Sequence, residues 1–100
     1  MSKGYWVVRI DVTDRVKYDA YQAVVDGPLR KYCGRFLVRG GQFETTEGSS
    51  RTRNVLVEFP TYRAALDCYR SPEYQDAVAK RRGGADFDFI VIDGYDGPQP

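Results

Sequence analysis

Two strand-like segments joined by a turn constrain this chain more than any other feature of its sequence. The first covers residues 35–41 and the second covers residues 53–60, and both are rich in the apolar and β-branched residues that favour strands. Between them, residues 47–50 have the Gly and Ser composition that is typical of turns. The pattern therefore predicts a long β-hairpin over residues 33–60.

The charges on the two arms suggest a register for this hairpin. Pairing the arms symmetrically about the turn places Arg39 opposite Glu58 and Glu44 opposite Arg53. Two opposite-charge pairs favour that register, because each contributes about 0.2–1 kcal/mol. The adjacent glycines at 40 and 41 also predict a β-bulge or a close approach of another chain segment in the first arm.

Strand and helix patterns on both sides of the hairpin complete a β-α-β-β-α-β order. The other predicted elements are a strand over 5–12, a helix from near Arg15 that is interrupted at Gly27-Pro28, a helix capped by Thr61, a helix beginning at residues 71–73, and a strand over 87–93. This order predicts an α+β, ferredoxin-like fold, a four-stranded antiparallel sheet with helices on one face. We expect a single domain over residues 1–96 and a C-terminal tail at 97–100.

The face of this sheet that the helices cannot cover is predicted to be apolar. It carries Val7, Leu37, Leu56 and either the pair Ile90 and Ile92 or the pair Phe89 and Val91. Apolar surface of this extent is not stable in water. We therefore expect a homodimer in which two sheets pack face to face.

The absence of histidine restricts the chemistry of this chain. Its 100 residues contain none, which excludes imidazole acid–base catalysis, Ser–His and Cys–His nucleophiles, and His-ligated metal or haem. Cys33 and Cys68 match no metal-binding or redox spacing, as is common for proteins of a reducing cytoplasm, which is the expected location. We predict neither a metal site nor a cofactor.

Charge and hydropathy argue against two classes of partner. The net charge is +1, from 15 basic and 14 acidic side chains mixed along the chain, so there is no electrostatic basis for binding nucleic acid or an anionic membrane. No apolar run approaches the roughly 20 residues that cross a bilayer. Residues 1–4 lead directly into the first strand, so we expect no signal peptide.

An ordered set of short motifs points to a family. These motifs are Gly4-Tyr5-Trp6, residues 11–14, residues 32–41, Glu58-Phe59-Pro60, Ala65, Tyr69, residues 71–74, an Arg at 81 or 82, and Gly94. In this order they resemble the family catalogued as domain of unknown function 1330, a member of the dimeric α/β-barrel proteins. Cys33 and Asp93 depart from its pattern, where Gly and Glu are more frequent.

The resemblance implies a dimeric α/β barrel and carries no agreed reaction. Relatives in the wider group include cofactor-free monooxygenases and muconolactone isomerase-like enzymes, which is a likeness of fold alone.

Arg39 and Glu58 form the first candidate site, expected on one sheet face with Arg9 and Asn54. One interpretation is an ion pair inside the dimer interface, since buried charges are costly unless paired. The other is that Arg39 binds the carboxylate of a ligand while Glu58 holds Arg39 or acts as a base.

Arg81 and a group of aromatic residues form the second candidate site. Arg81 lies on the inward stripe of its helix, so it either lays its stem on apolar surface and reaches water or points into a pocket and binds an acidic group. The aromatic group either belongs to the core or lines a ligand cavity, where Tyr hydroxyls supply polar contacts. Its members are Trp6, Tyr18, Tyr21, Tyr69 and Tyr74.

Two functions from different classes are consistent with these residues. The first is a small cofactor-free enzyme, isomerase- or monooxygenase-like, that acts on a small acidic or aromatic metabolite. Glu58, Tyr69 or Tyr74 would then be the base, with Arg39 or Arg81 stabilising an enolate-like intermediate. The second is a non-catalytic small-molecule-binding or accessory module that uses the same cavity.

Overall fold

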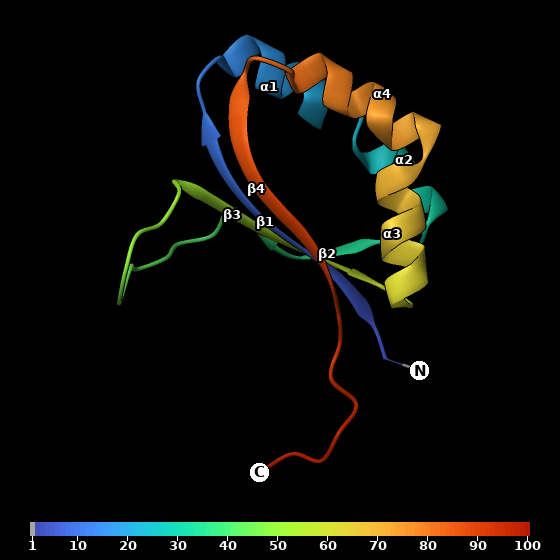
Figure 1. Ribbon diagram of the computed structural model, residues 1–100. Helices are drawn as coiled ribbons and strands as arrows, with labels where there is room; N and C mark the ends of the chain where they lie inside the picture. Colours follow the sequence, from blue (N-terminus) through green and yellow to red (C-terminus); the bar gives the residue numbers. More distant parts are fainter. Residues whose placement is uncertain (1) are drawn as a thin grey trace.

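The computed structural model describes residues 2–100, so Met1, the first residue of the predicted domain, lies outside the described residues. The elements in order are β1 (Gly4–Val12), α1 (Arg15–Gln22), α2 (Asp26–Lys31), β2 (Arg35–Arg39), β3 (Arg53–Phe59), α3 (Tyr62–Arg70), α4 (Pro72–Arg81) and β4 (Ala85–Asp93). The strands form one antiparallel sheet in the order β2-β3-β1-β4. The helices cover one face of it (Figure 1). The predicted α+β, ferredoxin-like fold is confirmed.

Three helices begin at the residues whose capping chemistry predicts them. The Asp14 carboxylate accepts hydrogen bonds from the amides of Val16 and Lys17 at the start of α1. Thr61 caps α3 and Ser71 caps α4 in the same way, each through its hydroxyl oxygen. These side chains satisfy amides that have no partner within the helix.

The predicted interruption of the first helix is also present. It falls at residues 23–25, between α1 and α2, slightly before Gly27-Pro28. Pro28 lies in the first turn of α2, where a missing amide hydrogen costs nothing.

The predicted register of the hairpin is wrong. Arg35, not Arg39, lies opposite Glu58, and Phe36 lies opposite Val57. This register places Phe36 on the helix-covered face, where it packs against the core. Burial of an aromatic ring contributes more than two exposed charge pairs, which is why the apolar pattern and not the charges determines the register.

A β-bulge between Phe36 and Val38 has a further effect on Arg39. Beyond the bulge, Arg39 pairs with Val55, whose side chain is buried under the helices. Arg39 therefore lies on the helix-covered face, whereas Glu58 lies on the open face. The two residues predicted to share one face are on opposite sides of the sheet.

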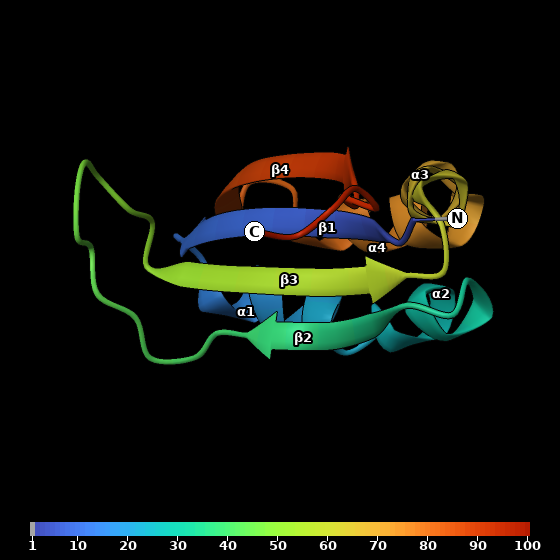
Figure 2. The same ribbon diagram turned by 90° about the horizontal axis from the view of Figure 1, so that it is seen from below.

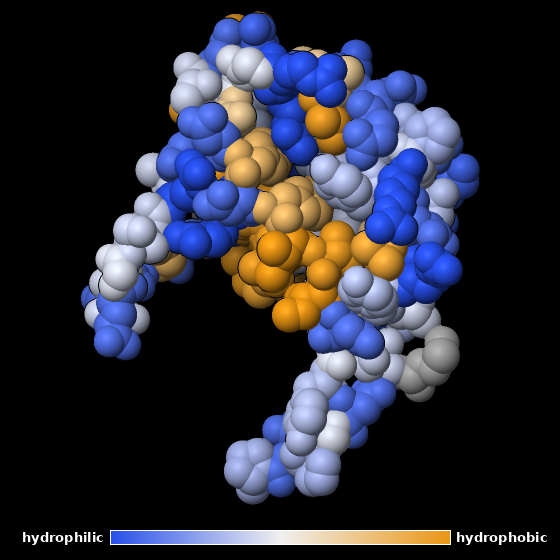
Figure 3. All heavy atoms as spheres, in the orientation of Figure 1, coloured by the Kyte–Doolittle hydropathy of each residue, from blue (hydrophilic) through white to orange (hydrophobic). Residues whose placement is uncertain are grey.

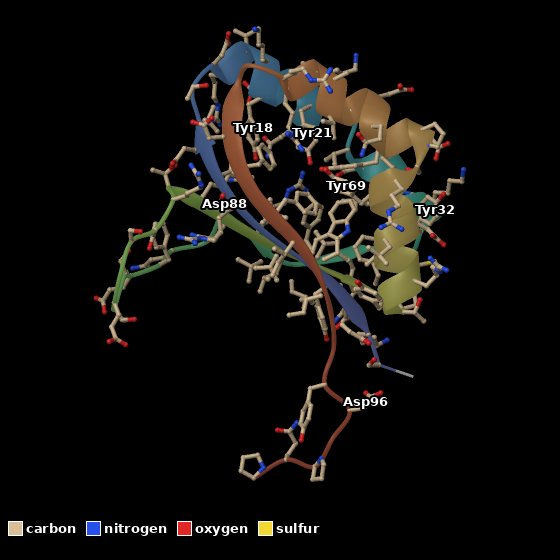
Figure 4. The ribbon with its side chains drawn as sticks, in the orientation of Figure 1. Tyr18, Tyr21, Tyr32, Tyr69, Asp88 and Asp96 are labelled. Atoms are coloured by element: carbon tan, nitrogen blue, oxygen red, sulfur yellow. The ribbon has the colours of Figure 1, made fainter. Side chains whose placement is uncertain are left out.

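The core lies between the sheet and the helices. Trp6, Val8 and Ile10 of β1 are buried there, with Val55, Val57 and Phe59 from β3 as their neighbours. Figure 4 shows Tyr18 and Tyr21 of α1 and Tyr69 of α3 directed from the helices towards the sheet. The core is thus a layer of aromatic and β-branched side chains, with phenol hydroxyls inside it.

The opposite face of the sheet is open and apolar. Ile90 is 54% exposed and Leu37 is 43% exposed, so of the two predicted alternatives for β4 it is Ile90 and Ile92 that face outward. Figure 3 shows an apolar patch between two projecting segments. These are the loop over residues 40–52 and the tail after Asp93. Seen from below, the loop extends beyond the end of the sheet, and the tail lies across the sheet (Figure 2).

No helix in residues 2–100 has the length and hydropathy that a membrane crossing requires.

Candidate functional site

A narrow cavity between the sheet and helices α1 and α2 is the best candidate for a ligand site. Its walls are apolar and aromatic, including Trp6, Phe36, Phe87 and Phe89. The centre of a water molecule can occupy about 30 Å³ in it. That is space for about two water molecules, and far below the several hundred Å³ of a pocket that encloses a drug-sized ligand.

The polar groups of this cavity gather around the Tyr18 hydroxyl. Tyr18 is buried, and its oxygen accepts hydrogen bonds from Arg53 Nε at 3.0 Å and from Gln22 Nε2 at 3.4 Å. A phenol oxygen has one proton to donate, and here its acceptor capacity is largely used. Within residues 2–100 the Tyr18 proton and the Nη protons of Arg53 have no side-chain acceptor.

Arg53 fits beside this cavity because residue 40 is a glycine. Gly40 has a φ of +70°, and a Cβ at this position would collide with the Arg53 guanidinium. Its amide donates to the Asn54 carbonyl at 2.8 Å, which fixes the first residue of the loop beside β3. The neighbour of Gly40 is thus a side chain and not the backbone segment that the two glycines predict; nothing lies within 4 Å of a Cβ at Gly41, and the bulge falls earlier, between Phe36 and Val38.

Arg39 lies at the mouth of the cavity. Its guanidinium stacks on the Phe36 ring, 4.1 Å from the ring centroid, and its Nη2 is 3.7 Å from Asp26 Oδ1. Both partners are substantially exposed, and a pair of this kind contributes about 0–1 kcal/mol. Among the residues described as lining the cavity there is no carboxylate. Its polar groups are therefore mainly donors, a set that suits an anion or a carbonyl oxygen.

Arg81 points inward from the end of α4. Its guanidinium carbon lies 3.6 Å from the centroid of Phe87 and 5.1 Å from that of Tyr21, two rings that line the cavity. Its Nε is buried and has no hydrogen-bond partner within residues 2–100. Arg81 therefore packs on the outer side of the cavity wall and adds positive charge without lining the cavity itself.

Two buried phenols lie between Arg81 and the cavity. The hydroxyls of Tyr21 and Tyr74 are 2.7 Å apart. Burial raises the pKa of Tyr21 well above 10.0, and burial also raises the pKa of Tyr74. Both phenols are protonated at neutral pH, so one hydroxyl donates to the other and neither acts as a base.

The other predicted site residues occupy different places. Trp6 is buried, lines the cavity and donates its indole N–H to the Ala65 carbonyl at 2.9 Å. Tyr69 packs edge-on against Trp6 and Phe89. Trp6 is thus a wall of the cavity, and Tyr69 lies in the aromatic layer behind it.

Glu58 lies on the open face and cannot reach the cavity. Its Oε1 accepts from Arg35 Nε at 3.0 Å, and its Oε2 accepts from the Tyr5 hydroxyl at 3.4 Å. The ion pair predicted between Glu58 and Arg39 is therefore replaced by one with Arg35.

Sequence reasoning includes Tyr18 among the aromatic residues that either belong to the core or line a cavity, but it does not identify Arg53 or Gln22 as site residues. It gives Arg53 only a partner in the hairpin, Glu44. The one available signal was the glycine pair at 40 and 41, because a glycine inside a strand-like arm indicates that another group approaches closely.

Cys68 is unsuited to chemistry. Burial raises its pKa to about 12, and its thiol contacts the Pro28 carbonyl at 3.6 Å. No group of three or more residues able to hold a metal ion occurs in the described part of the chain.

Comparison with known proteins places this chain in a family. Residues 3–95 match the family described as "Domain of unknown function (DUF1330)". The chain belongs to this family. No curated protein sequence matches it.

Solved structures resemble this DUF1330 protein in fold. A protein of unknown function from Rhodopseudomonas palustris, RPA0582, has a TM-score of 0.73 at 17% identity, covering 96% of this chain and 85% of that chain. SnoaB, a cofactor-independent oxygenase from Streptomyces nogalater, has a TM-score of 0.62 at 11% identity, covering 100% and 97%. A dimeric protein of unknown function with a ferredoxin-like fold, from Bacteroides fragilis, has a TM-score of 0.51 at 11% identity, covering 93% and 97%.

Proposed function

We propose that this DUF1330 protein is a homodimer that binds a small organic acid between its helices and its sheet. The carboxylate of the acid fills the water-sized space at Arg53 and Tyr18, and Arg39 at the mouth turns aside to admit the apolar body against the Phe36 ring. The observation that carries the proposal is the mainly donor set of the cavity. Arg53 makes no ion pair within residues 2–100, and its one side-chain partner there is the Tyr18 hydroxyl.

Calorimetric titration with benzoate and its neutral analogue benzamide tests this proposal. A charge-assisted hydrogen bond contributes about 1.5–3 kcal/mol, so benzoate is expected to bind about ten- to a hundredfold more tightly than benzamide. Arg53→Gln removes most of that difference, and Tyr18→Phe removes a smaller part. Arg63→Gln is the matched control, because Arg63 is exposed on α3 and does not line the cavity.

Equal affinities for the two ligands, or an Arg53→Gln variant that binds benzoate as the wild type does, would overturn the proposal. The melting temperature of each variant, measured without ligand, separates loss of the site from loss of the fold.

A catalytic role is the second candidate, and the same set of donors favours it. Donors that surround a substrate oxygen stabilise the negative charge of an enolate, which forms in proton-transfer isomerisation and in cofactor-free oxygenation. SnoaB, whose fold this chain shares, is a cofactor-independent oxygenase. Since Glu58 lies on the open face, the proton acceptor is a group of the ligand or of solvent. Tyr74 and Tyr69 then pack behind the cavity wall and do not accept the proton.

Incubation of a bound keto acid in deuterated water tests this second role. Deuterium uptake next to the carbonyl that depends on Arg53 supports catalysis, and uptake at the uncatalysed rate indicates a binding module.

The homodimer rests on the open face of the sheet. Leu37, Ile90 and Ile92 are large apolar side chains that are exposed in the single chain. Packing two such faces together removes them from water, which is favourable by about 25 cal/mol per Å² of apolar surface. The dimeric Bacteroides fragilis protein of similar fold supports this assembly.

A further inference from the structure

A groove outside the cavity runs along the edge of the sheet at β2. The centres of water molecules can occupy about 240 Å³ of this groove, compared with about 30 Å³ of the cavity. The groove is lined by Asp26, Leu29, Arg30, Gly34, Phe36 and Arg39. Leu29, Phe36 and Arg39 also line the cavity. The cavity and the groove therefore lie on opposite sides of one wall, which these three side chains form.

Arg39 is the part of this wall that can move. Leu29 is buried in the core, and Phe36 is held in the sheet beside Val57. The Arg39 side chain is 41% exposed, and it is held by stacking on Phe36 and by a 3.7 Å approach to Asp26. An anion in the groove can replace Asp26 at the guanidinium. When Arg39 turns outward, the cavity and the groove become continuous.

The charges around the wall are unbalanced. Three guanidinium groups line the two spaces, Arg53 inside and Arg30 and Arg39 outside, whereas the lining residues include one carboxylate, that of Asp26, which pairs with Arg39. A ligand with one carboxylate satisfies Arg53 and leaves the outer pair with Asp26. A second carboxylate on the same ligand satisfies the outer pair as well.

We propose that the cavity and the groove form one site for an elongated diacid with a flat apolar body, one carboxylate at Arg53 and Tyr18 and the other at Arg30 and Arg39. The proposal rests on the acid-binding function proposed above and names its ligand class. Arg39 and Arg53 are diagonal neighbours on adjacent strands, since Arg39 pairs with Val55. Diagonal positions are about 7–8 Å apart, a span that two carboxylates on opposite ends of one aromatic ring can bridge.

Terephthalate and 4-carbamoylbenzoate test the proposal, because they have the same shape and differ in one carboxylate. In calorimetric titrations the wild type is expected to prefer terephthalate about tenfold, the effect of one charge-assisted contact. Arg30→Gln reduces this preference to about threefold or less and leaves the affinity for 4-carbamoylbenzoate unchanged. Asp26→Asn raises the terephthalate affinity severalfold, because it removes the competing carboxylate. Arg63→Gln again serves as the control.

The outcomes separate this proposal from the one on which it rests. If benzoate binds and depends on Arg53 while terephthalate and 4-carbamoylbenzoate bind equally, the diacid is overturned and the acid-binding function stands. If the preference exists but survives both Arg30→Gln and Asp26→Asn, the groove is not the second half of the site, and the proposal is overturned. If benzoate itself binds without dependence on Arg53, the acid-binding function fails first.

Discussion

The two faces of the sheet differ in sequence and have opposite surroundings: along β1 the covered face is wholly apolar, whereas the open face mixes Val7 with Arg9 and Asp11. On the helix-covered face, Trp6, Val57 and Phe59 are fully buried, and the polar groups beside them are placed at the cavity. On the open face, Ile90 and Ile92 remain exposed, and the charged groups are ion pairs at its margins. The comparison shows that alternation identifies the wholly apolar face, which packs on the chain's own helices, and that the apolar residues of the mixed face stay exposed in the single chain.

The largest expected difference between the faces is in stability. Trp6→Ala removes the ring that contacts Phe59, Tyr74 and Phe89, and it is expected to lower the free energy of unfolding by about 3–5 kcal/mol. Val7→Ala, at the next position along β1 and on the open face, is expected to lower the free energy of unfolding by less than half as much. Urea unfolding followed by far-ultraviolet circular dichroism measures both, and equal losses would contradict the assignment of the two faces.

The next difference is in assembly. Leu56→Lys combined with Ile90→Lys places two charges on the open face and is expected to raise the dimer dissociation constant by about a hundredfold or more. Sedimentation should then show the 11.4 kDa single chain, with its circular dichroism unchanged. Val16→Lys, a substitution at a position of α1 that is 80% exposed, is the control that keeps the dimer. A double variant that sediments as the wild type does would show that the open face is not the interface.

A smaller effect on stability is expected at alkaline pH, and it arises from residues buried on the helix-covered face. Because burial raises the pKa of Tyr21 and of Tyr74 above 10.0, the folded protein keeps protons that the unfolded chain loses. This contribution to stability is complete below pH 10 and is lost as the pH rises further. Tyr21→Phe should make the alkaline loss shallower, at a cost of about 1 kcal/mol at neutral pH.

Phenolate absorbance during an alkaline titration checks this prediction. Two tyrosines should ionise only together with unfolding, and a folded protein in which every tyrosine ionises near pH 10 would contradict it.

The smallest effect is expected at the margin of the open face, where Arg51 binds Asp11 and Asp88. The hydrogen bond from Arg51 lowers the pKa of Asp88, whereas the pKa of Asp11 is lowered chiefly by the Thr52 amide. Arg51→Ala should therefore return the Asp88 pKa towards its usual value and leave most of the Asp11 shift. Carbon-detected NMR titration of the carboxyl groups measures both.

The lowered pKa values of Asp11 and Asp88 also predict how acid changes the stability of the loop over residues 40–52. Both carboxyl pKa values are lowered in the folded state, so their contribution is present above pH 3.8 and is lost as the pH falls below it. Faster proteolysis of residues 40–52 in Arg51→Ala, without global unfolding, would confirm that this ion-pair group holds the loop.

The sequence was sufficient to predict the fold, because caps and alternation act locally. Asp14, Thr61 and Ser71 each begin a helix where predicted, since the capping side chain and the amides it binds are close in sequence. The order of elements then determines the sheet.

The candidate site could be predicted only in part, because it depends on one bulge. The extra residue between Phe36 and Val38 places Arg39 on the other face of the sheet. No residue type at that position predicts a bulge. Strand periodicity places Trp6 on the inward face, where it is buried. Helix periodicity places Arg81 on the inward stripe but leaves open whether its guanidinium reaches water or a pocket. The role of Arg53 in the site could not be predicted because its partner, Tyr18, is 35 residues away in the sequence.

Trp6 gives this small protein a built-in optical reporter. It is the only tryptophan in the chain, and its indole forms part of the cavity wall. An aromatic guest that stacks near it would quench its emission, and displacement of water from the cavity would shift the emission maximum. Occupancy can therefore be followed on the unlabelled wild-type chain, at concentrations too low for calorimetry.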